Sequence, residues 1–218
     1  MLSYPKRIQV FAIASAALAG FVDAVAFVQL GGFFVSFMSG NSTRLGVGAA
    51  FGVVHALTAL ALIAAFVTGV VAGSAVGRAA QGRRRVRVML AVAALLAIAA
   101  FASMRGQVLI AALFSASGMG AINAVLEENG ESRIGLTYMT GALVKVGQRV
   151  TDALFGGPRW AWAPYLLLWT GLVGGALAGA LVFRLVGDNA LWFAVALTLG
   201  LTALIRWERR PLDASVAG

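Results

Sequence analysis

Long apolar runs separated by short polar segments dominate the chain. An α-helix needs roughly 20 largely apolar residues to cross a bilayer. Six stretches have this character, at approximately 8–30, 55–77, 88–104, 107–126, 162–186 and 189–205. The pattern therefore predicts an all-α membrane protein, with six transmembrane helices in a single integral membrane domain over residues 1–218.

A set of small and polar positions in the first predicted span returns 100 residues later. The recurring residues are Ala12, Ser15, Ala16, Gly20, Ala24 and Val25, which become Ala112, Ser115, Ala116, Gly120, Ala124 and Val125, while Asp23 becomes Asn123. Met38-Ser39-Gly40 returns as Met139-Thr140-Gly141, and the glycines at 69, 73 and 77 precede those at 171, 175 and 179. Three matches in one order indicate an ancient duplication, with repeat one at 8–104 and repeat two at 107–206.

Each repeat contains three predicted spans, so the second copy must enter the membrane upside down relative to the first. This 3+3 inverted repeat is common in transporters, where the solute site lies near the midplane between the repeats. We expect a half-turn about an axis parallel to the membrane to pair Gly20 with Gly120 and Gly40 with Gly141. The glycines at 69 and 171 should correspond in the same way.

Composition excludes a soluble globular protein, because 61% of the residues are hydrophobic and only 11% are charged. The net charge of +9 would suggest nucleic acid in a soluble chain, but here the basic residues flank the predicted spans. With a cytoplasmic N-terminus, all but three of the 17 Lys and Arg residues lie on the cytoplasmic side, the exceptions being Arg44, Arg105 and Arg184. The positive-inside rule then places both termini in the cytoplasm. Because this orientation accounts for the basic residues, no nucleic-acid partner is expected.

Few residues are suited to catalysis. The chain has no Cys and a single His, so neither a disulfide nor a clustered metal site is expected. No acidic groups cluster inside the predicted spans, which leaves little for acid–base or nucleophilic chemistry. We therefore expect no enzyme, no cofactor, and no catalytic or metal-binding residues.

Asp23 is the one acid within a predicted span. A charge there costs about 3 kcal/mol on insertion scales, so its side chain should face protein, water or a partner. It is a candidate solute ligand, and the alternative is a carboxyl group hydrogen-bonded to a neighbouring helix. Asn123 is its counterpart, and it can also be satisfied by bonding between helices.

The two Met-(Ser/Thr)-Gly segments are the second candidate. Ser39, Asn41 and Thr140 can cap helix starts, and Gly40 and Gly141 permit a sharp turn. Such segments can dip into the membrane as re-entrant or broken helices, provided that their free backbone groups face protein or water. The alternative is a surface amphipathic hairpin.

A basic residue follows each of these glycines by four positions. These residues, Arg44 and Lys145, together with the positive ends of the helices, would attract a small anion.

Three of these motifs also carry a resemblance to a known family. They are Phe37-Met38-Ser39-Gly40-Asn41, the Gly118-Met119-Gly120 run leading to Asn123, and Tyr138-Met139-Thr140-Gly141. Over nearly its whole length the chain resembles the YoaK-type six-span bacterial membrane proteins, a family defined as a domain of unknown function. The resemblance implies a multi-pass protein of the bacterial inner membrane, but no substrate.

The preferred hypothesis is a carrier or channel for a small solute, with an anion favoured, at the interface between the repeats. Its substrate-binding residues would be Asp23, Ser39, Gly40, Asn41, Arg44, Asn123, Thr140, Gly141 and Lys145. The alternative is a non-transporting assembly or regulatory protein that uses the glycine-ladder faces to bind a partner. Besides the lipid bilayer, a homodimer is therefore a second expected partner.

Overall fold

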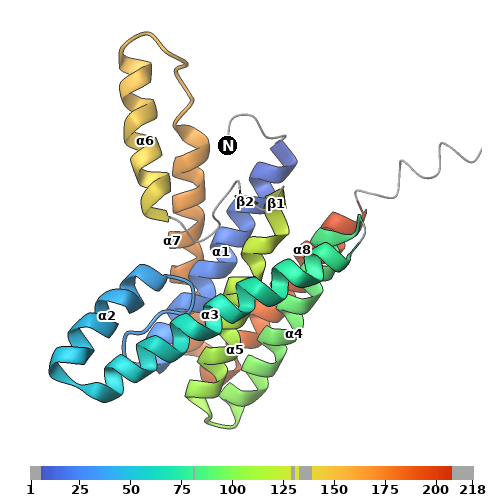
Figure 1. Ribbon diagram of the computed structural model, residues 1–218. Coiled ribbons are helices and arrows are strands. Elements are labelled where there is room, and N and C mark those ends of the chain that lie inside the picture. The colour runs from blue at the N-terminus through green and yellow to red at the C-terminus, as the bar shows by residue number, and fades with distance from the viewer. Residues whose placement is uncertain (1–5, 81, 129–130, 133–138, 208–218) are drawn as a thin grey trace, which may run out of the picture.

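The structure is a computed structural model that describes residues 6–80, 82–128, 131–132 and 139–207. It is helical almost throughout (Figure 1). The helices are α1 (Lys6–Gln29), α2 (Met38–Phe51), α3 (Val53–Ala79), α4 (Arg84–Met104), α5 (Val108–Ala121), α6 (Met139–Leu154), α7 (Ala163–Val186) and α8 (Leu191–Trp207). Short 3₁₀ turns, η1 (Ile122–Leu126) and η2 (Gly187–Asn189), follow α5 and α7, and the two-residue strands β1 (Glu127–Glu128) and β2 (Glu131–Ser132) pair antiparallel.

All six apolar stretches predicted from the sequence are helical. Five helical segments in the described part of the chain are long and apolar enough to cross a membrane, and the sixth, in α8, is apolar but shorter. The additional helices α2 and α6 precede α3 and α7 as the first arms of two helical hairpins (Figure 1). The protein is therefore a multi-pass helical membrane protein.

Glycines let two pairs of helices pack backbone against backbone. Gly20 of α1 lies on the backbone of Leu172 in α7, and a side chain at this glycine would collide with the Leu172 carbonyl. Gly120 of α5 lies in the same way on the Phe66 carbonyl of α3. The pairs α1–α7 and α3–α5 are thus held by equivalent contacts, as small residues permit in membrane helices.

The partner helices return these contacts with glycines of their own. Gly175 of α7 lies on the carbonyl of Ala17, and Gly69 of α3 lies on the carbonyl of Ser117. Since Ala17 and Ser117 are 100 positions apart, these contacts pair Gly69 with Gly175, at an offset of 106. The expected pairing of Gly69 with Gly171 is therefore wrong by four residues, about one helical turn.

The connection within each hairpin explains the larger offset. A single residue, Gly52, separates α2 from α3, whereas residues 155–162 separate α6 from α7. The extra residues lengthen the second hairpin before α7 begins. The spacing of glycines in the sequence cannot show this insertion, because an Ala/Gly-rich helix has a glycine near every turn and several pairings fit.

The core is formed mainly by α1, α4, α5, η1 and the face of α8 that packs on α4. Its largest fully buried side chains include Leu18, Val22, Met89, Leu96 and Met119. The short helices lie outside this core: α2 buries only Asn41 and Gly48, and α6 buries only Met139 and Ala142, among their described side chains. The short helices α2 and α6 therefore flank the bundle, whereas α3 and α7 are part of it.

Side-chain hydrogen bonds join helices at both ends of the bundle. Where α1 ends, the Gln29 amide donates to the Ser103 hydroxyl (2.7 Å) and to the Asp188 carboxylate (2.9 Å), which joins α1 to α4 and η2. At the opposite end Arg84 Nε donates to the Ala124 carbonyl (2.9 Å) and so joins α4 to η1. Helix α1 begins and α8 ends at the same, upper end in Figure 1.

Candidate solute site

The chain leaves helical geometry between α1 and α2. Gly31 and Gly32 have positive φ angles of 65° and 105°, which L side chains rarely adopt, and they end α1. Residues 33–37 are not helical, and α2 begins at Met38. The break expected at Gly40 therefore lies before it, and Gly40 itself is in the first turn of α2. A side chain at Gly40 would collide with the Phe37 ring, so this glycine serves packing and not a turn.

Asp23 binds the broken segment. Its Oδ1 accepts hydrogen bonds from the backbone amides of Val35 and Ser36, both at 2.7 Å, and its Oδ2 accepts one from the Ser36 hydroxyl. Hydrogen bonds that involve a charged group contribute about 1.5–3 kcal/mol each, so three of them offset an insertion cost of about 3 kcal/mol. Asp23 therefore needs no counter-ion to be accommodated.

Asn41 holds the same segment from the other side. Its Nδ2 donates to the Phe34 carbonyl (2.6 Å), and its Oδ1 accepts from the Phe34 amide (3.1 Å). The fully buried Asn41 side chain thus replaces the backbone partner that a helix would have supplied at Phe34. The expectation that Ser39 or Asn41 caps α2 is wrong, because the N-cap residue is Phe37 and no side chain caps the helix.

The second half handles its polar residue differently. Asn123 lies in η1, where its Nδ2 donates to the carbonyls of Met119 (3.0 Å) and Gly120 (3.4 Å) in the preceding turn. Thr140 and Gly141 lie in the first turn of α6, in the position that Ser39 and Gly40 occupy in α2. Tyr138 of the second motif, like residues 133–137, lies outside the described residues.

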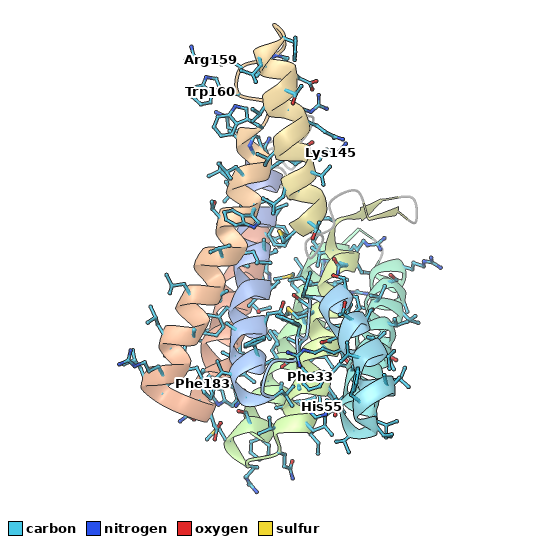
Figure 2. All side chains as sticks on the ribbon, turned by 90° about the vertical axis from the view of Figure 1, so that its left-hand side faces the viewer. Phe33, His55, Lys145, Arg159, Trp160 and Phe183 are labelled. Atoms are coloured by element: carbon cyan, nitrogen blue, oxygen red, sulfur yellow. The ribbon has the colours of Figure 1, made fainter. Side chains whose placement is uncertain are left out.

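The starts of α2 and α6 meet at one place, here called the junction. Both views show the two helices running away from it in roughly opposite directions (Figures 1 and 2). Two cavities of about 500 and 490 Å³ lie there, and both are lined by Ser36, Phe37, Met139 and Thr140. Ser39, Phe66 and Gly141 complete the smaller one with Met38. Residues of both halves therefore form the walls of each cavity.

The larger cavity is walled mainly by apolar side chains. It extends between α1 and α7 and is lined by Asp23, Phe27, Phe34 and Trp169, among others. The ring centroids of Phe27 and Phe34, and of Phe34 and Phe37, are 5.2 Å apart in each case. Of the described residues that line either junction cavity, only Asp23 has an ionisable side chain. A mostly apolar wall with a few placed polar groups is typical of small-molecule sites.

The two expected cations lie away from the junction. The Arg44 guanidinium stands 4.9 Å from the centre of the Phe33 ring, which in turn stacks on His55 at 6.1 Å. Arg44 and His55 line a separate groove of about 690 Å³ between α2 and α3. Lys145 is exposed on α6, toward the opposite end of the molecule from Phe33 and His55 (Figure 2).

Comparison with known proteins agrees with this picture of a membrane protein. Residues 11–204 match the family described as "Protein of unknown function (DUF1275)". The chain belongs to the DUF1275 family. A relative, the UPF0700 transmembrane protein RA0705 of Rhizobium meliloti (strain 1021), is 37% identical over 198 residues, which cover 88% of this chain and 86% of the relative. No solved structure matches the chain significantly.

The DUF1275 fold thus sorts the nine predicted site residues into groups. Asp23, Ser39, Thr140 and Gly141 line the junction cavities, whereas Gly40 and Arg44 line the α2–α3 groove, and Asn41, Asn123 and Lys145 line none of the three.

Ser36 and Trp169 line the larger cavity but escaped sequence reasoning. A signal existed for Trp169, which lies inside a span and not at its end, where tryptophans usually serve as anchors.

Proposed function

We propose that this DUF1275 protein is a carrier or channel for a small solute that binds at the junction. One observation carries the proposal: the cavities there are walled by the starts of two short helices that come from different halves of the chain. Sites of this kind, formed by discontinuous helices between repeats, are a recurring design of secondary transporters. An enzyme is not part of the proposal.

The proposal includes a 3+3 inverted repeat, in which α1–α4 correspond to α5–α8. The reciprocal glycine contacts support it, since α1 meets α7 as α5 meets α3. The opposite directions of α2 and α6 support it as well (Figure 1). We further propose that the protein lies in the bacterial inner membrane with both termini in the cytoplasm, because the positive-inside rule favours that orientation.

The nature of the solute is a separate question. The sequence favoured an anion because of Arg44 and Lys145, but neither residue lines a junction cavity. The anion preference therefore has no geometric support, and the proposal concerns a small solute without it. A small anion remains an outcome that solute assays would detect.

The alternative, a non-transporting assembly protein, relied on the glycine faces. Gly69 and Gly175 instead pack against α5 and α1 of the same chain. Those faces are consequently occupied and offer no surface to a homodimer partner. The alternative would need another surface, and the described residues supply no specific argument for one.

Single-cysteine labelling tests whether the junction admits solutes from water. The natural chain has no Cys, so Thr140→Cys would present one thiol. In sealed vesicles we expect a membrane-impermeant methanethiosulfonate to modify it, whereas Val67→Cys, on an exposed apolar face of α3, should stay unmodified. An unreactive Thr140→Cys that reacts only after denaturation would contradict the proposal.

A further inference from the structure

We propose that the larger junction cavity binds an uncharged solute with an apolar, aromatic-sized body and one hydrogen-bond donor directed at Asp23. This inference rests on the proposed function and names the chemical class of its solute. It follows from the polar groups, the charges and the rings that line the cavity.

The charges on the described lining residues favour neither an anion nor a cation. An anion would have to approach the Asp23 carboxyl group with no Lys, Arg or His among the described lining residues to compensate it. A cation would have to leave water for a carboxyl group that already accepts three hydrogen bonds from Val35 and Ser36. Burying an ion is costly unless it is well paired, so neither sign is favoured.

The same hydrogen bonds leave room for a neutral donor. A carboxyl group has about four acceptor positions; Val35 and Ser36 fill three of those of Asp23, and the Phe37 amide lies nearby. Asp23 retains 8% exposure and lines the cavity, so a guest there can reach its carboxyl group. A hydroxyl group or a neutral N–H on the solute can donate to it.

The apolar side chains that line the cavity determine the size and aromatic character of the solute's apolar part. The volume of about 500 Å³ lies in the range of small-molecule pockets. Phe27, Phe34 and Phe37 line one side and Trp169 of α7 lines another, which gives the cavity several ring faces and edges. Aromatic guests pack well against such rings, and Met139 supplies an adaptable thioether beside them.

A matched series of probes tests this inference by equilibrium dialysis with the purified protein, with detergent alone as the background. The probes are 2-phenylethanol, its methyl ether, 2-phenylethylammonium and phenylacetate, which share one ring and differ in their polar group. We expect the alcohol to bind about tenfold more tightly than the ether, which lacks the donor, and more tightly than either ion. Equal or tighter binding of an ion, or no preference for the alcohol over the ether, would overturn the inference.

Two variants locate the binding. Asp23→Asn keeps an oxygen for the Val35 and Ser36 amides but removes a free acceptor position, so the preference for the alcohol should fall below about threefold. Trp169→Leu should weaken all bound probes, whereas Trp160→Leu, on the distant hairpin connection, should weaken none (Figure 2). Unchanged selectivity in Asp23→Asn would exclude Asp23 as the acceptor.

The dialysis experiment tests the solute class, and the labelling experiment tests access from water, so the two proposals can fail independently. If Thr140→Cys reacts from water but no probe binds, only the solute class is wrong. If the alcohol binds but Thr140→Cys is inert in vesicles, the site exists without the proposed transport.

Discussion

The α2–α3 and α6–α7 hairpins have the same framework but are secured differently. The first follows a break that Asp23 and Asn41 hold with side-chain hydrogen bonds, and a single residue joins its two arms. In the second, Asn123 donates to the Met119 and Gly120 carbonyls of the preceding turn, and residues 155–162 join the arms. The first hairpin is thus fixed to α1 at its start by side chains, whereas among the described residues α6 packs mainly against α7.

The ends of the hairpins differ as well. The turn between α2 and α3 presents apolar side chains such as Phe51 and Val54, both strongly exposed, as lipid contact allows. The connection between α6 and α7 carries Arg159 and Trp160, whose guanidinium and ring are 5.6 Å apart. Arg and Trp are typical of the membrane interface. We therefore expect the second hairpin to reach the membrane surface and the first to remain in the apolar layer.

The largest expected effect is a loss of stability when a glycine contact common to both halves is filled by a side chain. Gly175→Ile should prevent recovery of folded protein, because a side chain there collides with the Ala17 backbone and overpacking of this kind costs more than about 3 kcal/mol. The adjacent Gly174 has open space around it, so Gly174→Ile should change stability by less than about 1 kcal/mol. Thermal unfolding and size-exclusion profiles of the two variants check this. Similar behaviour of both variants would contradict the α1–α7 packing.

The second effect is a difference in stability between variants at two equivalent polar positions, Asp23 and Asn123. Asp23→Ala should destabilise the protein by about 2–4 kcal/mol, because it leaves two buried amides without their acceptor. Asn123→Ala removes bonds to two carbonyls of the preceding turn, Met119 and Gly120, which together contribute about 1 kcal/mol. Asp23→Asn should retain most of the stability and part of the transport, whereas Asp23→Ala should lose transport. Denaturant unfolding of the three variants measures the difference, and equal losses at Asp23 and Asn123 would remove the asymmetry.

The smallest effect compares the two basic residues. Arg44→Gln removes a cation–π contact with Phe33 and should cost about 0.5–1 kcal/mol. Lys145→Gln removes an exposed charge and should cause no measurable change. Neither variant should alter binding at the junction. A large loss of solute binding in either one would restore the anion hypothesis.

Sequence reasoning predicted the spans well because hydrophobic length is a local property. The apolar run at 8–30 became α1, and the run at 162–186 became α7, with ends displaced by only a few residues. The sequence placed the candidate site at the two Met-(Ser/Thr)-Gly segments with Asp23 and Asn123; Ser39 and Thr140 line one junction cavity, but Asn123 lines neither. A motif that is repeated at two helix starts indicates equivalent positions in the two halves of the chain.

Other features were beyond the sequence because they depend on three-dimensional partners. The preference of Arg44 for the Phe33 ring cannot be read from a spacing that it shares with Lys145. The correspondence of Gly69 with Gly175 became visible only through the contacts of each with Ser117 and Ala17. Asp23 was recognised as unusual, but its partners at Val35 and Ser36 follow a break whose position the sequence placed too late.

The central claim is that the starts of α2 and α6 face one another across a shared cavity. It is tested most directly by a double variant, Ser39→Cys with Thr140→Cys, in a chain that is otherwise free of Cys. A short bifunctional thiol reagent should link the two cysteines within one chain, as mass spectrometry would show. The control pair Ser39→Cys with Thr151→Cys should not be linked, because Thr151 lies about 16 Å farther along α6. Failure of the first pair to link, or equal linking of both pairs, would contradict the arrangement of the two halves around one site.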